Sequence, residues 1–135
     1  MPLAESIATL RRANQPVPKP MRLPTQEEVA SIEAALGVQF HPDFRTFLLR
    51  ASDVVVGTME PVTIALRGSH TDLKEVATDA WAAGVPQSWV PVCESNGDYF
   101  CITPDGTVQF WSHDGPTDEH WASLSDWIDR VWLQS

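Results

Sequence analysis

Two turn dipeptides near the carboxyl end constrain the fold of this 135-residue chain more than any other feature. Asn96-Gly97 and Asp105-Gly106 separate three short apolar runs, and both dipeptides supply the positive φ angles that tight hairpins need. The sequence therefore predicts an antiparallel three-strand meander built from residues 89–93, 99–103 and 107–111.

The register of this meander is predicted from the spacing of its apolar residues. A first hairpin centred on Gly97 places Val92 opposite Ile102, and the second hairpin places Phe100 opposite Phe110. These pairs are apolar on one face, as a sheet with one buried side requires. We expect the opposite face, which mixes polar and aromatic groups, to be partly exposed. That face carries Cys93, Tyr99, Cys101, Gln109 and Trp111.

Apolar stripes and capping residues predict helices before and after the meander. Four prolines within residues 16–24 predict a stiff extended connector between the first two helices. Two further strands are expected at residues 54–56 and 62–66. The predicted helices begin near Leu3, Thr25, Pro42, Asp72 and Ser123.

These elements predict an α+β fold. We expect a mainly antiparallel sheet of about five or six strands, including the C-terminal meander, packed by about four or five helices. The length predicts a single domain over residues 1–135. Its N-terminal helix and Pro-rich connector occupy residues 1–24, and its core occupies residues 25–135.

The charge of the chain is strongly acidic and unevenly placed. Nine basic residues face eighteen acidic ones, for a formal net charge of −9. Residues 1–67 are neutral overall, whereas residues 68–135 contain Lys74 and Arg130 against eleven acids. This balance argues against nucleic-acid partners and favours a basic partner. With no apolar run of about 18 residues and no signal peptide pattern, we expect a cytoplasmic protein without membrane contact.

No residue pattern in the chain predicts catalysis, a metal site or a cofactor. The predicted register places Cys93 opposite Cys101, which leaves a cross-strand disulfide conceivable, but a reducing compartment favours two free thiols. The four histidines do not have metal-ligand spacing. Ser112-His113-Asp114 contains the residue types of a catalytic triad, but the side chains of adjacent residues diverge and cannot converge as a triad does.

The acidic and aromatic residues of the second half are the candidate binding surface. Tyr and Trp residues ringed by carboxylates can anchor a protein partner, while the charge raises the encounter rate. The other interpretation is that the acids only form turns and keep the chain soluble, and the sequence leaves both open. The candidate partner-binding residues are Asp98, Tyr99, Trp111, Asp114, Asp118 and Glu119, of which the last three lie in a predicted loop.

Several segments together resemble the SUKH superfamily, which groups bacterial proteins with fungal cell-wall regulators of the SMI/KNR type. A helix ending in Leu36-Gly37 precedes the run 38–49, which ends in Phe-Leu-Leu as the first family signature does. Segment 89–92 followed by Asn96–Ile102 resembles the second signature, and Thr107–His113 resembles the following strand. The sequence departs from the family pattern at Phe40-His41 and at Arg50–Asp53.

The resemblance implies an α+β fold and a function without catalysis. Bacterial members of the superfamily resemble immunity proteins that bind and neutralise toxins, often nucleases, of polymorphic or contact-dependent systems. The leading hypothesis is therefore an immunity protein that binds a cognate, basic toxin domain. The alternative is an intracellular regulatory or scaffold protein of the cell-wall-regulator type.

Overall fold

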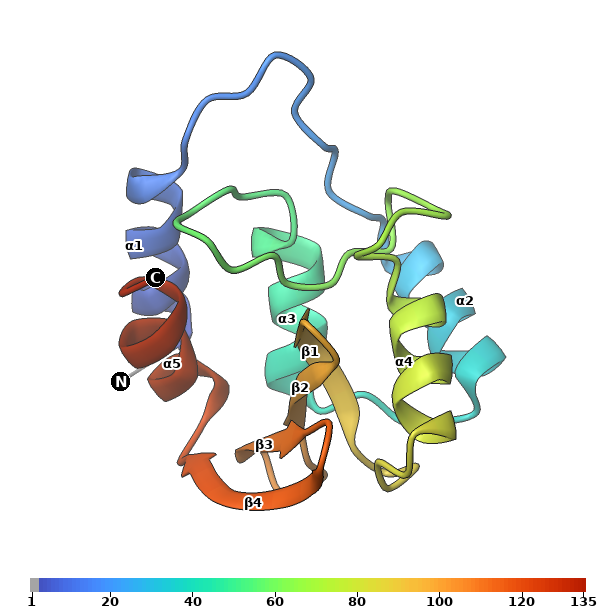
Figure 1. The fold of residues 1–135 in the computed structure, drawn as a ribbon. Helices are drawn as coiled ribbons and strands as arrows, with labels where there is room; N and C mark the ends of the chain where they lie inside the picture. Colours follow the sequence, from blue (N-terminus) through green and yellow to red (C-terminus); the bar gives the residue numbers. More distant parts are fainter. Residues whose placement is uncertain (1–2) are drawn as a thin grey trace.

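The computed structural model describes residues 3–135, so Met1 and Pro2 of the predicted N-terminal segment lie outside the described residues. Helices form where the sequence predicts them, and they are arranged around a sheet near the carboxyl end (Figure 1). The helices are α1 (Leu3–Ala13), α2 (Gln26–Leu36), α3 (Pro42–Ala51), α4 (Leu73–Ala82) and α5 (Leu124–Trp127), the last continued by a π-helical turn, η1 (Ile128–Trp132).

Side-chain caps fix where α2 and α3 begin. The Thr25 hydroxyl accepts the Glu28 N–H, and the Glu28 carboxylate accepts the Thr25 N–H, which completes the predicted capping box. Helix α2 ends at Gly37, whose φ of 69° lies in the left-handed region. At the start of α3, the ring nitrogen Nδ1 of His41 accepts the Asp43 N–H at 3.0 Å. His41 therefore performs the role that Ser, Thr or Asp usually has at this position.

The sheet is a four-stranded antiparallel meander in the order β1-β2-β3-β4. The α+β class is confirmed, with four strands among the described residues instead of about five or six. The predicted meander supplies three of these strands, and the fourth forms in the segment predicted as a loop. The strands are β1 (Val90–Ser95), β2 (Asp98–Ile102), β3 (Val108–Ser112) and β4 (Gly115–Trp121).

The predicted strands at 54–56 and 62–66 are wrong. Residues 54–66 contain no strand, and they contact neighbouring backbone through isolated bridges, such as Pro61 with Cys93, and through single hydrogen bonds. Val54, Val56 and Val62 are buried in the core, so their side chains account for the apolar pattern without a ladder. An apolar run therefore indicated burial correctly and strand structure incorrectly.

The predicted register is right for one hairpin and wrong for the other. Phe100 pairs with Phe110 as expected. In the first hairpin Asn96 and Gly97 both have positive φ and form a two-residue turn, so Glu94 pairs with Tyr99. The register then shifts between Pro91 and Cys93, where the intervening Val92 leaves the β1–β2 ladder. Its carbonyl instead accepts the N–H of Val62 at 2.8 Å.

This register also separates the two cysteines, because Cys93 pairs with Phe100 and Cys101 pairs with Pro91. The predicted cross-strand opposition of the cysteines is therefore wrong. Both thiols are free in the described chain, and both residues are fully buried.

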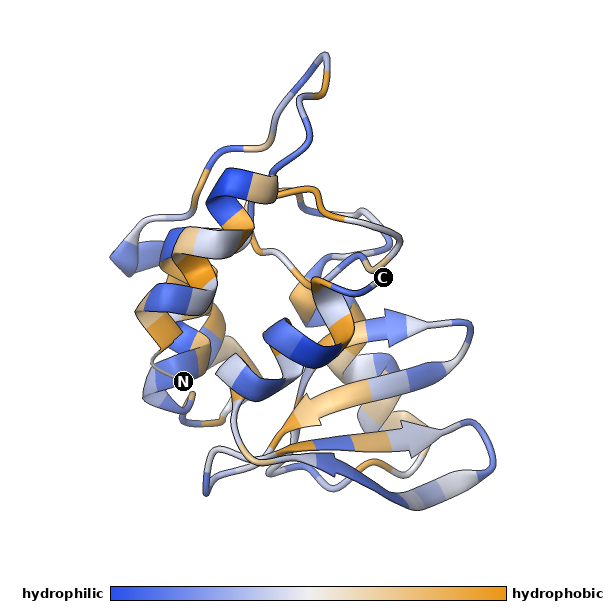
Figure 2. Ribbon diagram, turned by 90° about the vertical axis from the view of Figure 1, so that its left-hand side faces the viewer, coloured by the Kyte–Doolittle hydropathy of each residue, from blue (hydrophilic) through white to orange (hydrophobic). Residues whose placement is uncertain are grey.

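Aromatic side chains join the sheet to the C-terminal helices. Phe100 on β2 contacts Trp127 of α5, with ring centroids 5.4 Å apart, and Trp132 of η1 contacts Phe47 of α3 at 6.0 Å. The helices contain both hydrophobic and hydrophilic residues (Figure 2), and the buried ones, such as Leu10, Val29 and Phe44, are mainly apolar. Burial of these large rings contributes favourable free energy to folding.

Helix α4 packs against β1, and the sheet face predicted to be partly exposed is largely buried. Cys101 is completely buried, and Tyr99 is only 7% exposed. Cys93 pairs with Phe100 and therefore lies on the other face, contrary to the prediction. Trp111 and Gln109 keep partial exposure. The alternation of residues along the strands predicted which side chains share a face. It did not indicate that helix α4 covers the face that carries Tyr99 and Cys101.

The Pro-rich connector arches away from the rest of the chain between α1 and α2 (Figure 1). Its first residues are fastened to the loop that follows α3: Gln15 donates to the Val55 carbonyl, and the Asn14 side chain accepts the Val55 N–H, both at 2.8 Å. Among the described helices, none combines the length and apolar character that crossing a bilayer requires.

Candidate functional site

Asp98 and Asp114 lie together at one end of the sheet, joined by His113. Asp98 opens β2, and its carboxylate accepts the His113 backbone N–H at 2.8 Å and lies 2.9 Å from the ring nitrogen Nδ1. The other ring nitrogen of His113 is 3.5 Å from the Asp114 carboxylate. Accepting hydrogen bonds from His113 lowers the pKa of Asp98, and donating a side-chain hydrogen bond to Asp98 raises the pKa of His113.

Asp118 and Glu119 lie on β4, which is a strand and not the predicted loop. Both side chains are exposed. Strand β4 pairs only with β3 among the described residues, so its other edge is open. Charged side chains on an edge strand discourage pairing with other chains, which gives these acids a structural role besides any binding role.

Trp111 keeps an exposed part and packs against Trp89, whose backbone is in turn bonded by Trp81. Its ring meets that of Trp89 edge-to-face at 6.0 Å. The indole N–H of Trp81, on α4, donates to the Trp89 carbonyl at 2.9 Å. These contacts hold Trp111 in a fixed orientation, which suits a rigid aromatic anchor.

Tyr99 does not lie on the surface with the others. Tyr99 pairs with Trp111 across the strands as predicted, but its side chain is covered by α4. The expectation of an exposed tyrosine anchor is therefore wrong. The structure brings Asp98 and Asp114 together, places Asp118 and Glu119 farther along the edge strand, and places Tyr99 in a pocket.

The candidate nucleophiles are poorly placed for chemistry. Burial raises the pKa of Cys93 and of Cys101 to about 12, so both are thiols at neutral pH. The Ser112 hydroxyl donates to the Gly115 carbonyl and accepts the Asp114 N–H, which fastens the β3–β4 turn. No three His, Cys, Asp or Glu side chains within residues 3–135 are arranged to hold a metal ion.

A second group of acids, which the sequence interpretation did not single out, lies beside α4. Glu75 and Asp79 are four residues apart on this helix, and with Glu94 of β1 they line a cavity of about 250 Å³. The four-residue spacing was a readable signal, since residues at i and i+4 share one helix face. Glu94 comes from a strand, so only the structure brings it to the pair.

Comparison with known proteins agrees with this architecture. A solved crystal structure of a protein from Pseudomonas syringae pv. tomato superposes with a TM-score of 0.93 and is 45% identical in sequence. The match covers 98% of this chain and 99% of the other. The family model SUKH_5, described as SMI1-KNR4 cell-wall, matches residues 3–133. This chain belongs to the SUKH_5 family. No curated protein matches the sequence.

Family membership confirms the resemblance drawn from the residues. The match extends from α1 to the end of η1 and therefore includes the N-terminal helix and the connector. The segments that carried the resemblance are mainly structural: Gly37 caps α2, and the residues around Phe100 build the sheet and the core. The family signature therefore identifies the fold and leaves the binding surface to be argued from charge and exposure.

Proposed function

We propose that this SUKH-family protein is a cytoplasmic immunity protein that neutralises a cognate toxin domain by binding it, without catalysis. The observation that carries the proposal is the segregation of uncompensated negative charge into residues 68–135, which contain two basic residues against eleven acids. A toxin that acts on nucleic acid presents a basic groove, and an acidic protein of complementary charge can cover that groove and associate rapidly.

The distribution of ion pairs supports this proposal. In the first half, Asp53 pairs with Arg11, Glu28 with Arg22 and Glu33 with Arg45. Another first-half arginine, Arg67, pairs with Asp72 of the second half. In the second half, the only arginine is occupied by Asp126, at 2.7 Å. Most acids of this half therefore have no cation within residues 3–135, and their field extends into solvent. Carboxylates that only neutralised internal cations would not produce such a field.

Co-expression with any toxin-like protein encoded beside this gene tests the proposal. Rescue of growth, and a complex that remains intact in size-exclusion chromatography, are the expected results. A Trp111→Ala variant should weaken rescue more than neutralisation of Asp118 alone, because a buried anchor contributes more than an exposed charge. A Glu5→Gln/Glu27→Gln variant controls for net charge, because these two acids lie in the neutral half.

Failure of rescue together with absence of a complex would exclude the immunity function. The family description refers to the cell wall, which favours a regulatory or scaffold role as the second candidate. A stable complex with a non-toxin protein of a wall or signalling operon, and no protection against the toxin, would support that second role.

A further inference from the structure

The Pro-rich connector and the loop after α3 enclose a cavity of about 300 Å³, which we call the connector pocket (Figure 1). Val17, Lys19 and Met21 of the connector form one wall, and residues of the segment 52–71 form the other. Within the part of the chain that the structure describes, Val17 and Leu66 are the two large hydrophobic residues that stand exposed, at 37% and 47%. Both line this cavity, so exposed apolar surface is gathered at one place, as it is at binding sites.

The inner side of the connector pocket is formed by residues of the hydrophobic core. Trp132 and Val54 line it, and both are buried. The polar groups beside them are already bonded within the chain. The indole N–H of Trp132 donates to the Val56 carbonyl at 3.1 Å, and the Ser52 hydroxyl donates to the Leu48 carbonyl at 2.6 Å. These residues therefore offer a ligand apolar contact and no free donor, so the part of the ligand that enters the pocket is apolar.

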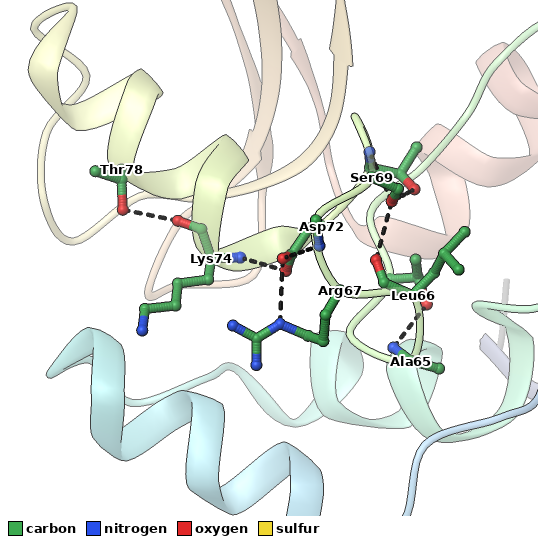
Figure 3. A network of polar contacts seen from close by, with 10 residues as sticks. Ala65, Leu66, Arg67, Ser69, Asp72, Lys74 and Thr78 are labelled. Atoms are coloured by element: carbon green, nitrogen blue, oxygen red, sulfur yellow. Dashed lines mark hydrogen bonds and ion pairs between the residues drawn. The ribbon is translucent and has the colours of Figure 1, made fainter.

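Leu66 is held in its exposed position by a network of hydrogen bonds in its loop (Figure 3). The Ser69 hydroxyl donates to the Leu66 carbonyl at 3.0 Å. Asp72, which is buried at the start of α4, accepts the Gly68 N–H at 2.9 Å and the Arg67 side chain at 3.1 Å. This wall of the pocket is therefore fixed before a ligand arrives, which reduces the entropy lost on binding.

The opposite wall is stiff as well. The prolines of residues 16–20 restrict the connector to extended conformations. One end of the connector is fastened where the Gln15 N–H donates to the Val55 carbonyl at 2.8 Å. At the other end, Arg22 pairs with Glu28 of α2 at 2.7 Å. A stiff segment that is fastened at both ends keeps the pocket open, because it cannot collapse onto the loop.

The charged residues at the mouth of the connector pocket indicate the polar end of the ligand. On the loop side, a carboxylate oxygen of Glu60 contacts the ring nitrogen Nε2 of His70. On the connector side, Lys19 has no carboxylate at ion-pair distance among residues 3–135. The Lys19 ammonium is therefore the charged group that is free to pair with a ligand, and its single positive charge matches an anionic head group of one charge.

The size and shape of the connector pocket favour a small molecule over a protein surface. Its volume lies at the lower end of the range for small-molecule sites, about 300–1,000 Å³. At roughly 30 Å³ for each water-sized group, about ten non-hydrogen atoms fill it. A flat protein surface cannot reach the inner side between two walls, whereas a slender molecule can. Met21 and Met59 line the pocket with unbranched side chains that adapt to the shape of such a molecule.

We propose that the connector pocket binds a small amphiphilic carboxylate, with its apolar body against Leu66 and Trp132 and its carboxylate at Lys19. This binding goes beyond the proposed function, because it uses the connector and the loop after α3 and none of the candidate partner-binding residues. It also requires no partner protein, so it holds or fails whatever the outcome of the rescue experiment.

A pair of matched ligands tests the pocket on the full chain. Octanoate is the probe, and octan-1-ol, which has the same apolar chain and no charge, is the control ligand. In a titration followed by amide NMR, octanoate should give saturable shifts around Val17, Lys19 and Leu66. A ligand of this size should bind with a dissociation constant of about 1 mM. Octan-1-ol should bind about two- to fivefold more weakly, because it cannot form the ion pair with Lys19.

Variants of exposed residues locate the binding and retain the fold. Val17→Ser/Leu66→Ser removes the two exposed apolar side chains and should weaken binding of both ligands about tenfold. Lys19→Gln should lower the affinity for octanoate to that for octan-1-ol and leave octan-1-ol binding unchanged. Lys74→Gln is the matched control, because it removes an exposed lysine on α4 outside the pocket, and it should bind both ligands as the wild type does.

Three results would overturn the proposal. The first is the absence of saturable shifts, or unchanged binding by Val17→Ser/Leu66→Ser. The second is equal affinity of the wild type for octanoate and octan-1-ol, because Lys19 would then bind no head group. The third concerns a second copy of the chain as the occupant: a dimer in light scattering that Val17→Ser/Leu66→Ser dissociates. A monomer that binds octanoate saturably, and more tightly than octan-1-ol, supports the proposal.

Discussion

Cys93 and Cys101 lie in the core, where a thiolate would lose its hydration. Burial raises the pKa of each thiol from 9.0 to about 12. The unfolded chain releases these protons near its lower pKa, whereas the folded chain keeps them. The contribution to stability is therefore complete below pH 9.0 and is lost as the pH rises toward 12. We predict that the free energy of unfolding falls in that interval by up to about 1.4 kcal/mol per pH unit for each thiol.

Denaturant unfolding at a series of pH values above and below 9.0 measures this slope. A Cys93→Ala/Cys101→Ala variant is the control, because it lacks both thiols. The pKa of Tyr99 is also raised, so some slope remains in both proteins, and the difference between the two curves is the quantity of interest. Parallel curves for the wild type and the variant would contradict the prediction.

Asp98 and His113 form an ion pair at the surface, and the stabilisation it gives is lost both at low pH and at high pH. The pKa of Asp98 is lowered, so the stabilisation is lost as the pH falls through that lowered value. The pKa of His113 is raised, so the stabilisation is also lost as the pH rises through that raised value. We predict that Asp98→Asn moves the pKa of His113 down toward its ordinary value, as measured by NMR titration of the ring protons. Asp118→Asn, the control, should leave it in place, and an unchanged titration in Asp98→Asn would contradict the pairing.

At the scale of elements, the β2–β3 hairpin turn lies close to the start of α3, where Gly106 approaches the His41 ring. Gly106 in this turn has a φ of 93°, and a Cβ there would lie 2.7 Å from Nε2 of His41, the residue that caps α3. We predict that Gly106→Ala lowers the free energy of unfolding by about 1–3 kcal/mol, through backbone strain and displacement of the His41 ring. Thermal or denaturant unfolding of the purified variant measures the loss.

Gly37→Ala is a matched control for this prediction. Gly37 also has positive φ, 69°, but a Cβ there meets no atom within 4 Å. The control variant therefore carries the backbone cost without the contact, and it should be less destabilised than Gly106→Ala. Equal losses in the two variants would show that the His41 contact contributes nothing.

The elements that the sequence predicted correctly are those whose local signals agree with their surroundings. The capping box at Thr25 and the positive φ angles of Asn96-Gly97 are local features, and both form as expected, although the hairpin is centred between Asn96 and Gly97 and not on Gly97. Strand β4 was missed because it is an edge strand: its side chains are mostly exposed and polar and include Pro116, so no alternation appears. The bulge at Val92 depends on the Val62 N–H, a contact distant in sequence that no local pattern records.

Across the whole molecule, the sequence predicted which candidate site residues are charged, but it did not predict which of them are buried. The acids of residues 68–135 could be counted in the sequence, and Asp114, Asp118 and Glu119 are indeed exposed. Tyr99 was misjudged because only the packing of α4 decides that it is covered. The second group of acids, Glu75, Asp79 and Glu94, combines a helix and a hairpin, and their juxtaposition belongs to the tertiary fold.

This charge distribution leads to a prediction about the kinetics of complex formation. If the uncompensated acids steer the partner, the association rate constant for the toxin domain should fall by about tenfold or more from low to physiological ionic strength. The dissociation rate should change much less, because the anchors in the interface are screened less than exposed charges. Stopped-flow association at several salt concentrations measures both. Neutralising Asp114, Asp118 and Glu119 should flatten the salt dependence, whereas Glu5→Gln/Glu27→Gln should not. An association rate independent of salt would show that the acidic half does not guide the encounter.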